Sequence, residues 1–162
     1  MRRMKMNKTL LFDEWETPLE TYYALCDKFK VYPELDVACT ALNCKCVEGH
    51  YADHGIDGLG MDWTRTVWCN PPHSETKKLV RKAYEQWQMH NITVMMTLPT
   101  NSMSAVYWHD CIEGKAESHA IKGRIRFLRD GRPANNPSRN AYVCVIWREK
   151  VAELSLNVTR GA

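Results

Sequence analysis

Long hydrophobic runs are absent from this sequence. The longest unbroken apolar stretch is Tyr142–Trp147, far shorter than the roughly 20 residues with which an α-helix crosses a bilayer. The basic stretch from Met1 to Lys8 has no apolar segment behind it, so we expect neither a signal peptide nor a membrane partner. Internal repeats and low-complexity segments are also missing, and the ordinary composition excludes collagen, coiled coil and disorder.

A disulfide framework is not indicated either. The seven cysteines are an odd number on a chain without an export signal, so we expect reduced thiols in a cytoplasmic protein. With 162 residues, of which 44% are hydrophobic and 25% charged, the chain suits one globular domain. We expect that domain over residues 13–150, between a basic tail at 1–12 and a C-terminal tail at 151–162.

The net charge is small, at +3, but it is unevenly distributed. Residues 31–63 carry one base, Lys45, against six acids. Residues 116–150 carry eight bases against three acids, and five of those bases are Arg124, Arg126, Arg129, Arg132 and Arg139. An acidic half beside a basic half predicts two ligands, one small and partly cationic or rich in hydroxyls, the other polyanionic.

Turn-forming residues and apolar periodicity predict alternating strands and helices. Thr17 fits the N-cap of a first helix, with Pro18 at its first position and Glu20 closing a capping box. Residues 40–64 contain many turn formers and no long periodic segment, so we expect an extended functional loop there. Further helices are expected from about residue 74 and over 102–113, and strands at about 34–39, 66–69, 91–98, 117–128 and 140–147. This order predicts an α/β sandwich with a mostly parallel sheet and an antiparallel C-terminal strand pair.

The sequence Asn70-Pro71-Pro72-His73 directly follows an expected strand, where α/β sheets bind their ligands. The two prolines remove main-chain donors and fix φ, so the carbonyls there are not drawn into a helix or a ladder. The Asn70 side-chain oxygen and the Pro71 carbonyl can accept both hydrogens of an exocyclic amine and make its nitrogen nucleophilic. A planar ring at His73 can stack on a base flipped out of the duplex. The same tetrapeptide also fits a plain strand-ending turn.

A rival constellation is Cys44-x-Cys46-x₃-His50-x₃-His54, with Cys39 nearby. Four soft or borderline ligands at such spacing can hold tetrahedral zinc. The Cys-x-Cys spacing is tight for one metal, and buried thiols beside a solvated histidine pair are the plainer interpretation. We therefore expect no metal. A small zinc-stabilised nucleic-acid-binding module without catalysis is the alternative from a different class of protein.

Four features resemble the phage-type DNA N6-adenine methyltransferases, the small Dam-like family of phages and prophages. They are Asp13-Glu-Trp-Glu-Thr-Pro18, Leu35-Asp-Val-Ala38, Asp57-Gly-Leu59 with Asp62-Trp63 and Val67-Trp-Cys-Asn-Pro-Pro72, and Gly123-Arg-Ile-Arg-Phe127. The order of carboxylate motif, cofactor loop, adenine motif and catalytic tetrapeptide is similar to the gamma-type arrangement. The resemblance covers about Asp13 to Arg148, nearly the whole chain.

The resemblance implies a minimal Rossmann-like sandwich that transfers methyl groups from S-adenosylmethionine to the N6 amine of adenine in DNA. It implies that Thr17 holds the cofactor's carboxylate, Asp36 its amino group and Asp57 its adenine amine. The implied cofactor-binding residues are Trp15, Thr17, Asp36, Ala38, Asp53, Asp57, Gly58 and Leu59, and the implied catalytic residues are Asn70, Pro71, Pro72 and His73.

The resemblance also implies double-stranded DNA as partner and a prokaryotic or phage-infected cell as setting. Arginine matches phosphate bidentately, so the five arginines between 124 and 139 are the expected DNA-binding residues. No protein partner is evident, and no separate target-recognition domain fits in the chain. A homodimer would enlarge the DNA footprint, although no residue pattern indicates one.

Two departures from the family pattern affect the site. The family usually has Tyr where this chain has His73, whose imidazole is smaller and partly protonated near neutral pH. About 20 residues separate Asp36 from Asp57, too few for a full helix and strand between them, and Ala38-Cys39-Thr40 stands where a glycine pair is usual. These departures leave the acidic residue that binds the ribose open, and Asp53 is the candidate. The same tetrapeptide logic serves any amino group on a base, so cytosine N4 in DNA and an RNA substrate are the alternatives within the class.

Overall fold

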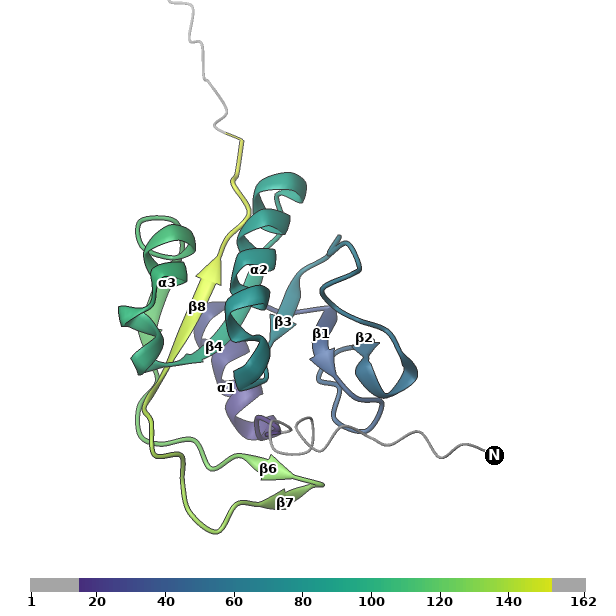
Figure 1. Ribbon diagram of the computed structural model, residues 1–162, viewed down its shortest axis with the longest axis vertical. Helices are drawn as coiled ribbons and strands as arrows, with labels where there is room; N and C mark the ends of the chain where they lie inside the picture. Colours follow the sequence, from purple (N-terminus) through teal and green to yellow (C-terminus); the bar gives the residue numbers. More distant parts are fainter. Residues whose placement is uncertain (1–14, 153–162) are drawn as a thin grey trace, which may run out of the picture.

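The chain folds around a six-stranded sheet with helices on both faces (Figure 1). The computed structural model describes residues 15–152, so the predicted tail at 1–12 and most of the predicted tail at 151–162 lie outside the described residues. The strands follow the order β2-β1-β3-β4-β8-β5. Their bounds are β1 (Leu35–Cys39), β2 (Glu48–Tyr51), β3 (Val67–Cys69), β4 (Val94–Pro99), β5 (Glu117–Ala120) and β8 (Tyr142–Trp147).

The direction of the strands confirms the predicted fold class. Strands β1, β2, β3 and β4 pair in parallel, whereas β8 is antiparallel to both β4 and β5. The sheet is therefore mostly parallel, with an antiparallel C-terminal pair, as in a Rossmann-like methyltransferase sandwich. A separate two-stranded ribbon of β6 (Leu128–Arg129) and β7 (Arg132–Pro133) lies at the lower edge of the view in Figure 1.

The helices cover the sheet from two sides because successive strand residues point to opposite faces. On one face Leu79 of α2 belongs to the same core as Val67 of β3. On the other face Tyr22 of α1 packs with Trp68, the next residue of β3. The helices are α1 (Leu19–Phe29), α2 (Thr76–His90) and α3 (Val106–Cys111), with 3₁₀ turns η2 (Ala52–His54), η3 (His73–Glu75) and η4 (Thr100–Ser104). In the described part of the chain no helix is long and apolar enough to cross a membrane.

The prediction of an extended loop over residues 40–64 is wrong in one respect, because this segment contains β2. The strand Glu48–Tyr51 pairs in parallel with β1 after a connection that holds no helix. Its sequence, Glu-Gly-His-Tyr, has no apolar run, and its hydrogen bonds to β1 hold it in the sheet. The register shifts by one residue between Asp36 and Cys39 of β1, which bends the strand end near the predicted site.

Two other segments are shorter than predicted. The strand expected over 117–128 ends at Ala120, and Gly123 then adopts a left-handed conformation that does not continue a strand. The helix expected over 102–113 is divided, because Ala105 is extended between η4 and α3. The strands expected at 34–39, 66–69, 91–98 and 140–147 are present, with ends shifted by up to three residues.

The carboxyl ends of β1, β3 and β4 meet at one edge of the sheet. Because β8 is antiparallel, its first residue, Tyr142, pairs with Pro99 at the end of β4. Strand β5 ends beside β8 at the same edge, where Ala120 pairs with Val143. The segment between β5 and β8 therefore leaves and returns at the edge where parallel sheets bind their ligands.

Candidate active site

The side-chain amide of Asn70 is held at both ends just beyond β3. Its Nδ2 donates to the main-chain oxygen of Trp15 at 2.9 Å, and its Oδ1 accepts from the Thr97 hydroxyl at 3.2 Å. These two bonds fix which end of the amide carries the oxygen. An amide oxygen has two lone pairs, so Oδ1 can accept a further hydrogen bond from a ligand.

Asn70 lines a narrow hollow of about 20 Å³, called here the Thr17 hollow. Its walls are Trp15, Glu16, Thr17, Asp36, Ala38, Asn43, Lys45, Trp68 and Asn70. The prediction that Thr17 caps the first helix is wrong, because Pro18 occupies the cap position and no side chain caps α1. Among the described residues the buried Thr17 hydroxyl has no hydrogen-bond partner. Leaving such a group unpaired costs about 1–3 kcal/mol, so a ligand that accepts from it would be stabilised.

Asp36 places a buried carboxylate in the Thr17 hollow. The residue is 2% exposed, and its oxygens accept from the main-chain N–H of Ala38 at 3.2 Å and of Lys45 at 3.0 Å. Burial raises the pKa of the Asp36 carboxyl to about 6, although those N–H groups oppose the shift. The Lys45 ammonium is itself paired with Glu16 at 2.8 Å. A cationic ligand would relieve the cost of holding this carboxylate ionised.

A second hollow, of about 400 Å³, shares Ala38 with the first and is called here the Asp57 hollow. Asp57 closes an Asx turn, because its Oδ1 accepts from the N–H of Leu59 at 2.9 Å. Between them Gly58 lies so close to β1 that a Cβ atom would be 2.1 Å from the main-chain oxygen of Val37. Only glycine fits at that position without moving the loop.

His50 lines the Asp57 hollow, although the sequence pattern indicated it only as a zinc ligand. It is 8% exposed, and its Nδ1 has no hydrogen-bond partner within residues 15–152. Burial lowers the pKa of His50, so its imidazole is neutral at pH 7. His50 reaches this hollow because it belongs to β2, the strand beside β1. Since β2 was not recognisable from the sequence, neither was this position of His50. Asp53, the predicted ribose contact, is not among the residues that line this hollow, and its carboxylate accepts from the N–H of Ala41 at 3.1 Å.

A third hollow, of about 370 Å³, is called here the His73 hollow. Its walls are Trp15, His73, Phe127, Ala134, Asn136, Pro137, Ser138, Arg139, Asn140 and Tyr142. The guanidinium of Arg129 lies over the Trp15 ring, 5.0 Å from its centroid. Aromatic rings combined with side-chain amides and a hydroxyl suit a planar heterocycle that carries its own donors and acceptors.

The predicted tetrapeptide contributes a residue to each of the three hollows. Asn70 lines the Thr17 hollow, Pro72 the Asp57 hollow and His73 the His73 hollow. Trp15 is shared by the first and third, as Ala38 is by the first and second. The turn after β3 therefore stands at the junction of three binding spaces.

The five predicted arginines gather on the segment between β5 and β8. Arg139 lines the His73 hollow, and the Arg124 guanidinium donates to the main-chain oxygen of Arg139. Arg124 and Arg126 also line a groove of about 930 Å³ between α1 and this segment. Arg132 is exposed on β7, and Arg129 covers Trp15. The basic half of the chain thus borders the same edge as the three hollows.

The zinc set predicted as the rival constellation is not assembled. Among residues 15–152 the group whose ligand atoms lie close enough for a metal is Asp36, Cys39 and Cys44. Cys46 is not a member of this group, and its sulfur lies 3.6 Å from the hydroxyl of Tyr22. All seven cysteines are free thiols.

A mostly parallel sheet with helices on both faces, and an Asn-Pro-Pro-His turn at a strand tip, define the class as Rossmann-like methyltransferases. The family model described as DNA N-6-adenine-methyltransferase (Dam) matches residues 5–160, and the chain belongs to this family. The resemblance seen in the sequence is therefore confirmed.

Two phage proteins illustrate the relationship. The chain is 28% identical over 131 residues to the DNA N-6-adenine-methyltransferase of Escherichia phage T1, a match that covers 81% of this chain and 54% of that protein. It is 29% identical over 121 residues to the DNA N-6-adenine-methyltransferase of Haemophilus phage HP1 (strain HP1c1), with 73% and 68% covered. The chain thus spans about half the length of the first relative and about two thirds of the second.

Proposed function

We propose that this chain transfers a methyl group from S-adenosylmethionine to the N6 amine of adenine in double-stranded DNA, after the base has flipped out of the duplex. The observation that carries the proposal is the junction of three hollows at the turn after β3. Such a turn can face a methyl donor on one side and a base on the other. Membership of the family supports adenine as the target.

We assign the methyl donor, which supplies a methyl group on a sulfonium when bound, to the Thr17 and Asp57 hollows because of the polar groups that line them. The Thr17 hollow, at about 20 Å³, would have to widen to admit the donor's amino-acid end. The unpartnered Thr17 hydroxyl would donate to the donor's carboxylate, and the Asp36 carboxylate would receive its ammonium group. Asp57 would accept from the adenine amine, and the neutral His50 imidazole would bond a ribose hydroxyl, with Asp53 as the second ribose candidate. The remaining walls would be Trp15, Ala38, Gly58 and Leu59.

The target amine would be held by the turn itself. Asn70 Oδ1 and the Pro71 carbonyl would accept hydrogen bonds from its two N–H groups. These bonds would reduce the delocalisation of the nitrogen lone pair into the ring and make the nitrogen more nucleophilic. His73 would stack on the base, and Trp15, Phe127 and Tyr142 would wall the same hollow. As the new N–C bond forms, the C–S bond of the methyl group would break and leave the donor as a neutral thioether, and the methylated nitrogen would lose one proton to water. The reaction requires positioning but no covalent link to the protein.

The arginine-bearing segment would bind the DNA backbone beside the site. Phosphate contacts position a duplex without reading its sequence, which suits five arginines around a loop that contains Pro, Asn and Gly. The reaction would take place where DNA lies in the cytoplasm of a prokaryotic or phage-infected cell.

The test is to incubate the full chain with S-adenosylmethionine carrying an isotopically labelled methyl group and unmethylated duplex DNA, digest the DNA and identify the labelled nucleoside. We expect N6-methyladenine. Label in N4-methylcytosine would support the cytosine alternative, and label that appears only when RNA replaces the DNA in a parallel reaction would support the RNA alternative. Absence of both label and calorimetric binding of the donor would overturn the proposal.

A further inference from the structure

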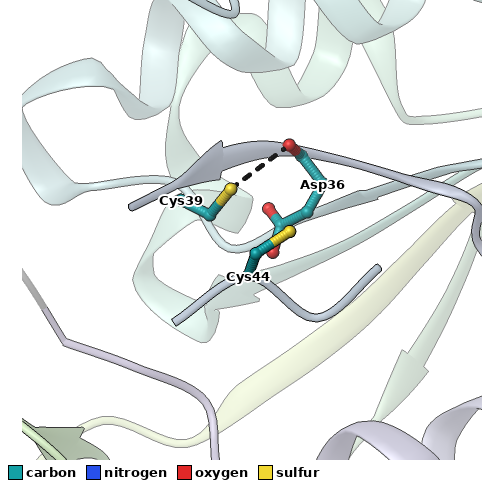
Figure 2. A group of neighbouring side chains, drawn as sticks. All are labelled: Asp36, Cys39 and Cys44. Atoms are coloured by element: carbon teal, nitrogen blue, oxygen red, sulfur yellow. Dashed lines mark hydrogen bonds between the residues drawn. The ribbon is translucent and has the colours of Figure 1, made fainter. Parts of the chain in front are cut away.

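Two thiols and a carboxylate meet beside the Thr17 hollow. One carboxylate oxygen of Asp36 and the sulfurs of Cys39 and Cys44 all lie within 4.8 Å of one another (Figure 2). Asp36 and Cys39 belong to β1, and Cys44 belongs to the connection to β2. Asp36 and Cys39 are 2% and 5% exposed, whereas Cys44 is half-buried, so the group is approached from the side of Cys44.

The two thiols have only weak partners. Cys39 donates to the main-chain oxygens of Asp36 at 3.5 Å and His50 at 3.7 Å, and Cys44 donates to those of Cys46 at 3.3 Å and Glu48 at 3.6 Å. A thiol is a weak donor, so little stability is sacrificed when these bonds are replaced.

A glycine makes room for the pair of sulfurs. A Cβ atom on Gly49 would lie 2.7 Å from the sulfur of Cys39 and 2.7 Å from that of Cys44. The two sulfurs therefore border one small space, which any side chain at position 49 would fill.

We propose that Asp36, Cys39 and Cys44 form a binding site for a thiophilic divalent cation, with Zn²⁺ as the physiological example. Tetrahedral zinc with Zn–S bonds of about 2.3 Å places neighbouring ligand atoms about 3.8 Å apart, so side-chain rotations that bring the three atoms about 1 Å closer are sufficient. Water would take the fourth position. Binding converts both thiols to thiolates and releases their two protons to solvent.

The metal would compete with the methyl donor for Asp36, an expectation that rests on the proposed function. The Asp36 carboxylate is the group assigned to the donor's ammonium, and it cannot serve both ligands in full. Zinc and S-adenosylmethionine would therefore weaken each other's binding by the same factor. The nearby Lys45 does not block the metal, because its charge is paired with Glu16.

The test begins with metal binding by the full chain, freed of metal by a chelator and kept reduced by a phosphine. Zn²⁺ is titrated against a chromophoric chelator, and Co²⁺ reports thiolate ligation through its charge-transfer absorption. We expect one ion per chain, a Co²⁺–thiolate band, and binding weaker by about tenfold or more in Cys39→Ser and in Cys44→Ser. Cys46→Ser is the matched control, because this half-buried thiol lies in the same connection but outside the group.

The thermal unfolding of each variant is followed by circular dichroism. If Cys39→Ser does not fold, Cys44→Ala is used in its place to test metal binding. No zinc binding by the wild type, or binding unchanged in the Cys44 variants, would overturn the proposal. So would an effect of Cys46→Ser as large as that of Cys44→Ser.

A second arm separates this proposal from the proposed function. The dissociation constant of S-adenosylmethionine is measured with and without saturating Zn²⁺, and we expect a rise of about tenfold in the wild type and none in Cys44→Ser. Zinc binding without competition would support the metal site and contradict the role of Asp36 toward the donor. Donor binding and methyl transfer in a protein that binds no zinc would overturn the metal site alone.

Discussion

Asn70 is the residue on which the proposed chemistry depends most directly. Its amide is oriented by Trp15 and Thr97, so that Oδ1 lies in a fixed place with one acceptor position to offer. We expect Asn70→Ala to lower kcat about 10²–10³-fold, the usual effect of removing one fixed hydrogen-bonding group from a transition state. Donor affinity, measured by calorimetry, should change little.

Asn70→Asp is the control for this prediction. It keeps an acceptor oxygen but loses the donor to Trp15, so its activity should lie between that of the wild type and that of Asn70→Ala. Near-normal turnover in Asn70→Ala would remove the assigned role.

Asp36 predicts a pH dependence of donor binding. Its raised pKa, about 6, means that the folded protein holds this proton more tightly than the unfolded chain does. Protonation of Asp36 therefore stabilises the ligand-free fold, fully so below the unfolded pKa of about 4. This contribution to the free energy of unfolding disappears as pH rises through about 6. Ammonium binding requires the ionised form, so donor affinity should fall as pH drops below about 6.

The measurement is a series of donor dissociation constants between about pH 5 and pH 8, with a chelator and a reductant present. In Asp36→Asn the affinity should be weak and the step near pH 6 should disappear. An identical step in that variant would assign the titration to another group.

At the scale of elements, the predictable parts are those with a strong local signal. The apolar runs of β1, β3, β4 and β8 were sufficient to predict four strands, and the prolines after β3 and at the end of β4 mark where they stop. Strand β2 was not predictable, because four residues without an apolar run are held by pairing with β1 rather than by their own composition. For the same reason the role proposed for His50 was not visible in the sequence.

The Gly58 loop tests whether the packing of an element positions the site. In Gly58→Ala the methyl group would lie 2.1 Å from the Val37 carbonyl, so the loop must move away from β1. We expect a decrease of about 1–3 kcal/mol in the free energy of unfolding and weaker donor binding, because Asp57 moves with the loop. Urea denaturation and calorimetry measure the two effects.

Gly60→Ala is the matched control, since its nearest neighbour would be the Asp57 carbonyl at 3.7 Å, an ordinary van der Waals distance. Equal effects of the two substitutions would mean that glycine flexibility, not close packing, explains the result.

At the scale of the whole molecule, the uneven charge seen in the sequence corresponds to two regions of one edge. The acidic segment, residues 31–63, contains β1, β2 and the turn at Asp57. The arginines lie on the segment between β5 and β8. Charge counting indicated two ligands, but only the topology brings these distant segments together. The three hollows were likewise not predictable, since Trp15 lies beside Asn70 in one hollow and beside Tyr142 in another through tertiary packing rather than through any local pattern.

The arginine segment predicts a salt-dependent interaction with DNA. In Arg126→Ala or Arg132→Ala, DNA affinity should fall, and the slope of log affinity against log salt should become shallower by about one for each phosphate that the variant no longer binds. Arg65→Ala is the control, because this exposed arginine precedes β3 at the opposite edge of the sheet and lies 3.1 Å from Glu48. An unchanged slope in the Arg126 and Arg132 variants would place these residues outside the interface.

The most direct measurement is a crystal structure of the full chain with S-adenosylhomocysteine, the product form of the donor. We expect its amino-acid end beside Thr17 and Asp36, its adenine in the Asp57 hollow and its sulfur facing Asn70. Density for the ligand in the larger groove between α1 and the arginine segment, with the Thr17 and Asp57 hollows unliganded, would contradict the proposed function.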